Sequence, residues 1–101
     1  MFALSDIGWI VGHKMTVYSP LLRGATSIMY EGKPIGTPNS GVLWRIIEDY
    51  KIKSIFLAPT GVRGIKKDDL NGDLLKYHDL SSLKSIHVAG ERCDPETFKW
   101  L

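Results

Sequence analysis

Cysteine is nearly absent from this sequence: Cys93 is the only one among 101 residues. The chain therefore cannot form an internal disulfide or a cysteine-rich metal site, which is typical of proteins from reducing compartments. The sequence also lacks an apolar run of membrane-spanning length and an N-terminal secretory signal. We therefore expect a cytoplasmic or mitochondrial-matrix protein that is not secreted.

A strong excess of charge of one sign is also missing. The chain has 13 Lys and Arg residues against 11 Asp and Glu residues, and its net charge is +2. This charge is too small to favour binding to nucleic acid or to a membrane surface. Basic and acidic side chains are interleaved at 66–69, as on a solvated face. We expect neither nucleic acid nor a membrane as a partner.

Several motifs of cofactor and catalytic chemistry are absent. Residues 60–67 contain glycines and lysines but not the spacing of a phosphate-binding P-loop, and no Gly-x-Gly-x-x-Gly pattern follows a strand. Ser40 is not on a nucleophile elbow. His13, His78 and His87 have no partner at metal-ligand spacing, so we expect no metal site.

Two single residues keep alternative interpretations. His13 follows Gly12 at a predicted strand–helix junction, so it is either a functional histidine or a capping and packing residue. Cys93 lies near the start of the last predicted helix, where a thiol can become reactive, but no base is evident nearby. The sequence therefore does not favour a cysteine nucleophile.

Strand-like and helix-like segments alternate along the chain. Strands are expected within 5–12, 25–30, 52–57 and 85–89, and helices within 13–22, 41–50, 60–65 and 94–101, with a further packed turn at 74–77. This order predicts an α/β fold in which alternating βα units form a small parallel sheet with flanking helices. The bare outer strands and the short last helix favour a partial domain spanning residues 1–101.

Local signals refine these helices. Pro20 is expected to kink or end the first helix, and Gly24 to follow its end. Ser40 and Thr60 are expected to cap the helices that follow them. The buried stripe of the second helix is predicted to consist of Leu43, Trp44, Ile47 and Tyr50.

The stretch Ser85–Pro95 predicts a buried strand that passes directly into a helix. Gly90 permits a positive φ at the strand end, Asp94 is a good N-cap, and Pro95 suits the first helical position. Ligands of open α/β sheets bind beyond the carboxyl ends of strands, so this turn is either a binding segment or simply a tight connection. Two further strand ends are predicted at 9–12 and 58–60, and together the three fit a ligand cleft.

Motifs in these segments resemble short-chain acyl-CoA synthetases of the adenylate-forming superfamily. The matching stretches are Asp6–His13 (D-x-G-W-x-x-G-H), Tyr18–Thr26 (Y-x-P-L-x-x-G-A-T), Tyr30–Gly32, Ala58–Thr60 with Arg63, Asp79–Leu83 and Gly90–Glu91. They follow the family's order over nearly the whole chain. Residues 89–94 are most similar to the propionyl-CoA synthetase-like branch, although acetyl-CoA synthetases remain part of the resemblance.

The resemblance implies a central part of the large N-terminal, AMP-binding domain of a two-step ligase. Such an enzyme uses ATP and Mg²⁺ to convert a carboxylate, here propionate or acetate, to acyl-AMP. CoA then displaces AMP to give the acyl-CoA. The implied small-molecule partners are therefore a carboxylate, ATP and CoA.

The resemblance also assigns binding roles, residue by residue. It implies an acyl pocket at Trp9, Ile10, Val11 and Gly90. It implies adenine and AMP binding at Gly90, Glu91 and Arg92. It implies CoA binding at Val11 and Ala58. Ile10 is bulkier than valine and favours short acids, whereas Val11 stands where threonine is frequent and removes a polar contact.

The sequence lacks the family's Ser/Thr/Gly-rich phosphate loop, its Tyr-x-x-Thr-Glu magnesium motif and its adenylation lysine. We therefore expect no catalytic residue within these 101 residues and no ligase activity from the chain alone. Two alternatives remain. One is a stand-alone α/β module that binds a nucleotide or an acyl group. The other is a non-functional fragment that forms homo-oligomers through exposed sheet edges or apolar faces.

Overall fold

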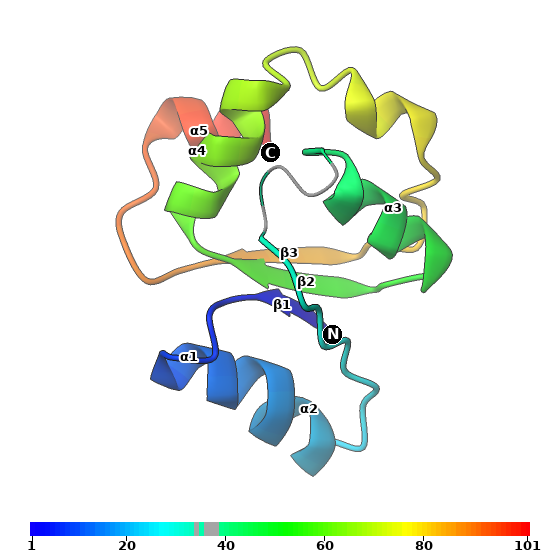
Figure 1. Cartoon of the computed structure of the whole chain (residues 1–101), viewed down its shortest axis with the longest axis vertical. Helices are drawn as coiled ribbons and strands as arrows, with labels where there is room; N and C mark the ends of the chain where they lie inside the picture. The colour runs from blue at the N-terminus through cyan, green and yellow to red at the C-terminus, as the bar shows by residue number, and fades with distance from the viewer. Residues whose placement is uncertain (34, 36–38) are drawn as a thin grey trace.

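The computed structural model describes residues 1–33, 35 and 39–101. Of the turn-forming residues in the predicted loop 33–41, Pro34, Gly36 and Pro38 lie outside the described residues. Within the described ranges, the chain forms a three-stranded sheet with helices on both faces (Figure 1). This arrangement confirms the predicted α/β class with a small parallel sheet and flanking helices.

The sheet is parallel throughout and has the order β1-β2-β3. Its strands are β1 (Phe2–Leu4), β2 (Ser54–Leu57) and β3 (Ser85–Val88). Their last residues, Leu4, Leu57 and Val88, lie opposite one another in the register. The carboxyl ends of all three strands therefore lie side by side along one edge of the sheet, and the segments that follow the strands begin next to one another.

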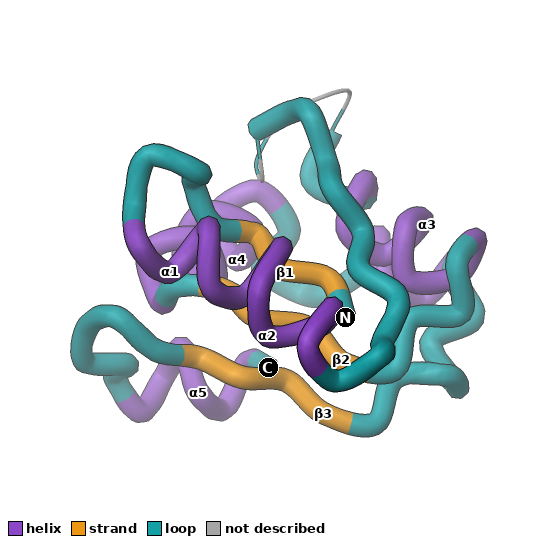
Figure 2. The backbone as a smooth tube through the Cα atoms, turned by 90° about the horizontal axis from the view of Figure 1, so that it is seen from below, coloured by secondary structure: helices purple, strands orange, loops and turns teal. Residues whose placement is uncertain are grey.

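Helices cover the two faces of this sheet unequally. They are α1 (Ile10–His13), the π-helical turn η1 (Lys14–Tyr18), α2 (Ser19–Leu22), α3 (Val42–Asp49), α4 (Pro59–Asp68), the 3₁₀ turn η2 (Leu74–Tyr77) and α5 (Pro95–Trp100). The helices α3, α4 and α5 lie on one side (Figure 1). The continuous rod of α1, η1 and α2 lies on the other side, near β1, and does not cover β3 (Figure 2).

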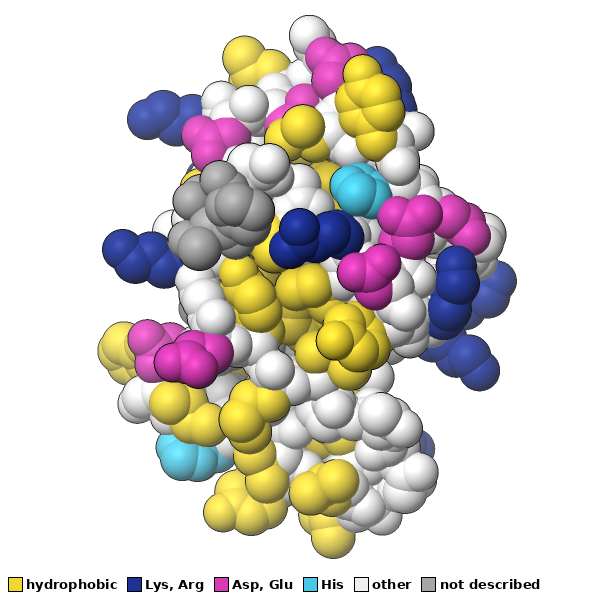
Figure 3. All heavy atoms as spheres, turned by 45° about the vertical axis from the view of Figure 1, so that its right-hand side comes forward, with side chains coloured by type: hydrophobic (Ala, Val, Ile, Leu, Met, Phe, Trp, Pro, Cys, Tyr) yellow, Lys and Arg dark blue, Asp and Glu magenta, His cyan; other side chains and the backbone are white. Residues whose placement is uncertain are grey.

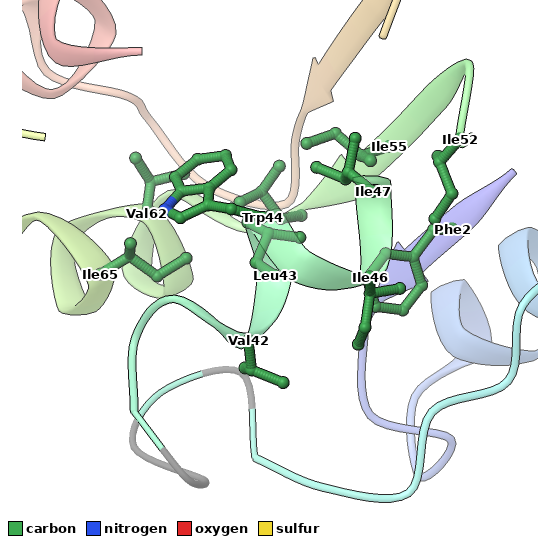
Figure 4. Close-up of a cluster of buried hydrophobic side chains, with 11 residues drawn as sticks. Phe2, Val42, Leu43, Trp44, Ile46, Ile47, Ile52, Ile55, Val62 and Ile65 are labelled. Carbon is green, nitrogen blue, oxygen red and sulfur yellow. The ribbon is translucent and has the colours of Figure 1, made fainter. Parts of the chain in front are cut away.

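The hydrophobic core lies between the sheet and the helices α3 and α4. Phe2 and Ile55 enter it from neighbouring strands, and Ile47 and Val62 meet them from the two helices (Figure 4). All four side chains are fully buried. Burying an aliphatic or aromatic side chain of this size stabilises a fold by about 1.5–3 kcal/mol, so this cluster is what fixes the sheet beneath α3 and α4.

The first strand and helix begin earlier than the sequence predicts. The strand is Phe2–Leu4, and Ile10–His13 is helical instead of strand-like, so His13 lies within the helical rod and not at a strand–helix junction. Asp6 causes the difference, because its carboxylate accepts a hydrogen bond from the Gly8 amide at 2.6 Å and its carbonyl accepts one from the Trp9 amide at 3.1 Å. This tight turn leaves the next apolar residues free to start a helix.

Of the two expected effects of Pro20, ending the first helix is wrong, because α2 continues through it to Leu22. A proline cannot donate a backbone hydrogen bond, and the carbonyl left without its helical partner four residues earlier belongs to Thr16. The Ser27 hydroxyl donates a hydrogen bond to that carbonyl, and η1 widens the helix just before Pro20. The helix then ends near Gly24, as predicted, with a φ of +64° at this glycine.

The segment 25–30 forms less β-structure than predicted. It makes one isolated parallel bridge, between Ile28 and Phe2, in which the Ile28 amide donates to the Met1 carbonyl at 3.0 Å. The outer edge of β1 is therefore covered at one residue. At the other edge, β3 is half-buried instead of fully buried, and its His87 is exposed.

Of the three predicted helix caps, only the one at Asp94 is confirmed. The Asp94 carboxylate accepts a hydrogen bond from the Thr97 amide at 2.9 Å and so caps α5, with Pro95 at the first helical position. Ser40 does not cap α3, because its hydroxyl donates to Asp68 at 2.6 Å. Thr60 does not cap α4, because it lies inside the helix.

The predicted buried stripe of α3 is confirmed at three residues and wrong at its last residue, Tyr50. Leu43, Trp44 and Ile47 are buried, whereas 64% of Tyr50 is exposed. Tyr50 follows the end of α3, where the backbone leaves helical geometry, so its side chain no longer continues the stripe.

Candidate functional site

The three predicted binding segments follow the three strands at their common edge. The segment after β1 leads into α1, the segment after β2 is the start of α4, and the segment after β3 leads into α5. Figures 1 and 2 show all three on the same side of the molecule. Parallel sheets place ligands at this edge because the connecting segments there diverge from neighbouring strands.

The first segment presents apolar side chains to solvent. Trp9 and Ile10 are 72% and 78% exposed, and Val11 is half-buried. Gly12, by contrast, is buried against the turn after β1. A Cβ atom on Gly12 would lie 2.8 Å from the Asp6 carbonyl carbon and 2.9 Å from the Ile7 Cα atom, so the close packing of α1 on this turn requires glycine.

The second segment is the N-terminus of α4. Ala58 is the half-buried N-cap residue in extended conformation, and Pro59 occupies the first turn. Ala58 supplies no capping side chain, so the first backbone N–H groups of α4 need acceptors from elsewhere.

The third segment supplies that acceptor. Gly90 has a φ of +103°, as its predicted turn role requires, and it turns the chain toward α4. The Glu91 carboxylate then accepts hydrogen bonds from the Thr60 amide, at 2.8 Å, and from the Thr60 hydroxyl. A helix N-terminus is a common phosphate site, but here a carboxylate of the chain itself already occupies it.

Arg63 connects the same two segments more extensively. Its Nε atom donates to Asp94 Oδ1 at 2.9 Å, one terminal nitrogen donates to Glu91 Oε2 at 3.3 Å, and the other donates to the Arg92 carbonyl at 2.9 Å. We call Thr60, Arg63, Glu91 and Asp94 the loop clamp. The clamp holds residues 91–94 against α4.

The clamp joins the second and third segments but not the first. Within the described ranges, no hydrogen bond or ion pair links Trp9–Val11 to Ala58 or to Gly90–Arg92. The family motif includes Arg63, but the motif alone does not predict that its side chain joins these two segments. One signal was present: Thr60 and Arg63 are three residues apart, so they share one face of a helix.

Hydrogen bonding in the clamp favours the charged forms of its side chains. The pKa of Glu91 is lowered, mainly by the Thr60 hydroxyl, then by the Thr60 amide and by Arg63. The pKa of Asp94 is lowered mainly by the Thr97 amide, with further contributions from the Thr97 hydroxyl and Arg63. The pKa of Arg63 is raised, chiefly by its hydrogen bond to Asp94. The clamp is therefore fully ionised at neutral pH.

This ionisation predicts a small loss of stability in acid, because the clamp's ion pairs are partly exposed. Because the pKa of Glu91 in the folded chain lies below its usual 4.5, the group stabilises the fold above that pH and loses its contribution as the pH falls through the folded-state pKa. We expect a small fall in Tm as the pH drops below about 4.5, and a smaller fall in the Glu91→Gln variant. Thermal unfolding followed by circular dichroism measures both; equal losses would contradict the assignment to Glu91.

A groove of about 1310 Å³ lies between the rod and the face of the sheet that the rod leaves open. Its lining includes Met15, Phe56, His87 and Cys93. Of the residues predicted to bind ligands, all of which the structure describes, none lines this groove. The groove nevertheless adjoins the third segment, because Ala89 and Cys93, on either side of Gly90–Arg92, line it.

Two classes of site have no support in the described part of the chain. No three His, Cys, Asp or Glu side chains there gather closely enough to hold a metal ion. No helix there has the length and apolarity that crossing a membrane requires.

Known proteins with sequences similar to this chain are AMP-binding enzymes and acyl-CoA synthetases. Residues 1–101 match the sequence profile of the family described as "AMP-binding enzyme". The chain is 46% identical over 99 residues to "Acyl-CoA synthetase short-chain family member 3, mitochondrial" of Homo sapiens, which covers 98% of this chain and 14% of that protein. It is 46% identical over 100 residues to "Propionate--CoA ligase" of Salmonella typhimurium, which covers 99% of this chain and 15% of that protein.

A third relative is "Acyl-CoA synthetase short-chain family member B, mitochondrial" of Dictyostelium discoideum, which is 49% identical over 100 residues. That match covers 99% of this chain and 14% of the relative, so the chain spans only a small part of the length of these curated proteins. The family match, in contrast, runs over the whole chain. The chain therefore belongs to the AMP-binding enzyme family.

Proposed function

We propose that residues 1–101 form part of the substrate-binding region of an ATP-dependent short-chain acyl-CoA synthetase. One observation carries the proposal: in a chain that matches the AMP-binding family throughout, the three predicted binding segments follow adjacent parallel strands at one sheet edge. The reaction joins a short carboxylate, propionate or acetate, to CoA. The carboxylate attacks the α-phosphate of ATP and releases pyrophosphate, and the CoA thiol then attacks the acyl carbon and releases AMP.

The residues of the site suit the adenylate and acyl ends of such an intermediate better than its phosphates. Glu91 fills the N-terminus of α4, so that helix end is closed to a phosphate group. Gly90, Glu91 and Arg92 are proposed to hold AMP, and Val11 and Ala58 to border the CoA arm. Phosphate and Mg²⁺ binding are proposed to depend on groups outside these 101 residues.

The exposed apolar segment after β1 is proposed to face the acyl group. Trp9, Ile10 and Val11, with Gly90, would surround a short alkyl chain and exclude water from the acyl carbonyl. Excluding water protects a reactive acyl-AMP from hydrolysis and strengthens electrostatic contacts to its charged groups.

A segment exchange tests this function. The matching 100 residues of the Salmonella propionate–CoA ligase would be replaced by this chain, and acyl-CoA formation measured with acetate, propionate and butyrate. We expect the folded chimera to form propionyl-CoA or acetyl-CoA, and the 101-residue chain alone to form none. A chimera that folds normally but forms no acyl-CoA would overturn the proposal, and acyl-CoA formation by the isolated chain would overturn its dependence on outside groups.

Substrate size gives a sharper prediction in the same chimera. Replacing Ile10 with Ala removes side-chain volume from the proposed acyl pocket, so selectivity should move from propionate toward butyrate. Each methylene in an apolar pocket changes kcat/KM by about 10- to 200-fold, so we expect a shift of at least about tenfold in the ratio of the two values. Leu22→Ala, at an exposed position of α2, is the control and should leave the ratio unchanged.

Location and self-association belong to the same proposal. The names of two relatives include "mitochondrial", and we propose a mitochondrial-matrix or cytoplasmic location.

We also propose that the isolated chain associates with itself through the rod of α1, η1 and α2, where Ile10, Leu21 and Leu22 are exposed. Figure 3 shows hydrophobic side chains gathered at the level of this rod. A light-scattering mass of one chain at high concentration would exclude the association.

A further inference from the structure

The guanidinium group of Arg63 has three different acceptors from the segment after β3. Its three nitrogen atoms donate separately to Asp94, to the Arg92 carbonyl and to Glu91, at 2.9, 2.9 and 3.3 Å. Only arginine can do this, because its planar group carries five N–H donors in a fixed geometry, whereas lysine offers one charged nitrogen.

These acceptors also fix the two helix ends that border the segment. Glu91 caps α4 through Thr60, and Asp94 caps α5 through the Thr97 amide at 2.9 Å. The turn at Gly90 is thus followed by three residues that Arg63 attaches to α4. Without Arg63, Glu91 would keep Thr60 as a partner, but the Arg92 carbonyl would lose its donor.

The exposure of the clamp indicates that its main effect is local. The side chains of the Arg63–Glu91 pair are each 40% exposed, and Asp94 is 44% exposed. Ion pairs this exposed contribute little to global stability, because water screens them and ordering long side chains costs entropy. What the clamp does determine is the path of the backbone between β3 and α5.

We propose that Arg63 is a positioning residue for the adenylate-binding segment, and that Glu91 acts through Arg63 and Thr60 and not by contacting the ligand with its carboxylate. This inference rests on the proposed function, since it takes Gly90–Arg92 as the AMP-binding segment. It goes beyond that function because it proposes that Arg63, on α4, fixes the backbone conformation of residues 90–94 before AMP binds. A preorganised segment binds more tightly because less ordering is needed at the moment of binding.

The test uses the 101-residue chain with Arg63→Lys, Arg63→Ala and, as a matched control, Arg45→Lys at an exposed site on α3. Three quantities are measured: Tm, the NMR amide shifts of residues 90–94, and the Kd for AMP. We expect both Arg63 variants to keep a Tm near that of the wild type, to shift the 90–94 amides and to raise the Kd at least about tenfold. Arg45→Lys should change none of the three.

A double variant separates positioning from direct contact. If Glu91 acts through Arg63, then Arg63→Lys combined with Glu91→Gln should weaken AMP binding no more than Arg63→Lys alone. Additive losses would overturn the indirect role of Glu91. Unchanged amide shifts and unchanged Kd in both Arg63 variants would overturn the role of Arg63.

Failure of the proposed function gives a different result. If the wild-type chain binds no AMP, the proposed ligand is wrong, and with it the adenylate role of the segment. The amide shifts still decide the structural claim in that case: shifted 90–94 amides in Arg63→Lys support the clamp, and unshifted ones refute it.

Discussion

Replacing Leu57 with Ala should lower the free energy of unfolding by about 2–5 kcal/mol. Leu57 is the last residue of the central strand β2, is only 2% exposed and belongs to the main core cluster. Truncating it removes buried apolar surface and leaves a cavity directly beneath the start of α4. A domain of this size typically has a total stability of about 5–15 kcal/mol, so the loss is a large fraction of the whole.

Urea unfolding followed by circular dichroism measures this loss. Leu22→Ala provides the matched control, because the same chemical change is made at a leucine that is 87% exposed. It should change the stability by less than about 0.5 kcal/mol. If Leu57→Ala does not fold, Ile55→Val on the same strand should still show a loss of about 0.5–1.5 kcal/mol. Equal losses at Leu57 and Leu22 would mean that β2 is not the centre of the core.

Gly12→Ala should destabilise the fold by about 1–3 kcal/mol, although alanine is normally the better helix residue. The added Cβ atom would meet backbone atoms of Asp6 and Ile7, and backbone cannot move aside without shifting the turn after β1. That turn leads directly to Trp9 and Ile10, so the variant should also displace the proposed acyl pocket.

Gly61→Ala is the internal control for this prediction. Gly61 lies in α4, and a Cβ atom there would meet nothing within 4 Å. Alanine should therefore stabilise the chain by about 0.5–1 kcal/mol. The two glycine variants should change Tm in opposite directions, and a rise in both would show that α1 does not pack closely on the Asp6 turn.

Sequence reasoning located the elements whose signals are local. The strands β2 and β3 are apolar runs that end at Pro59 and Gly90, and α5 is preceded by the Asp94–Pro95 capping pair. Each of these signals lies within a few residues of the feature that it predicts. The α/β class and the strand ends before Ala58 and Gly90 followed from them, whereas the predicted strand end at 9–12 is wrong because Ile10–His13 is helical.

One error arose where a contact between residues far apart in the sequence decides the structure. Pro20 is tolerated because the Ser27 hydroxyl reaches the Thr16 carbonyl, a contact across 11 residues that no local pattern reveals. The second error has a local cause: the apolar run Trp9–Val11 resembles a strand, but the turn that Asp6 forms with Gly8 and Trp9 makes it the start of a helix.

The loop clamp was unpredictable for the first of these two reasons. Arg63 lies 28 to 31 residues from its acceptors, so its role depends on β3 pairing beside β2 in register. The family resemblance marked the segment after β3 as a binding segment and marked Arg63 as part of a motif. It did not connect the two.

The most direct test of a shared binding edge is an NMR titration of the ¹⁵N-labelled 101-residue chain with AMP. We predict that the amide shifts change first at Gly90–Arg92, with smaller changes at Ala58–Thr60 and Trp9–Val11. Shifts confined to groove residues such as Met15, Phe56 and His87, or no shifts at saturating AMP, would contradict the account.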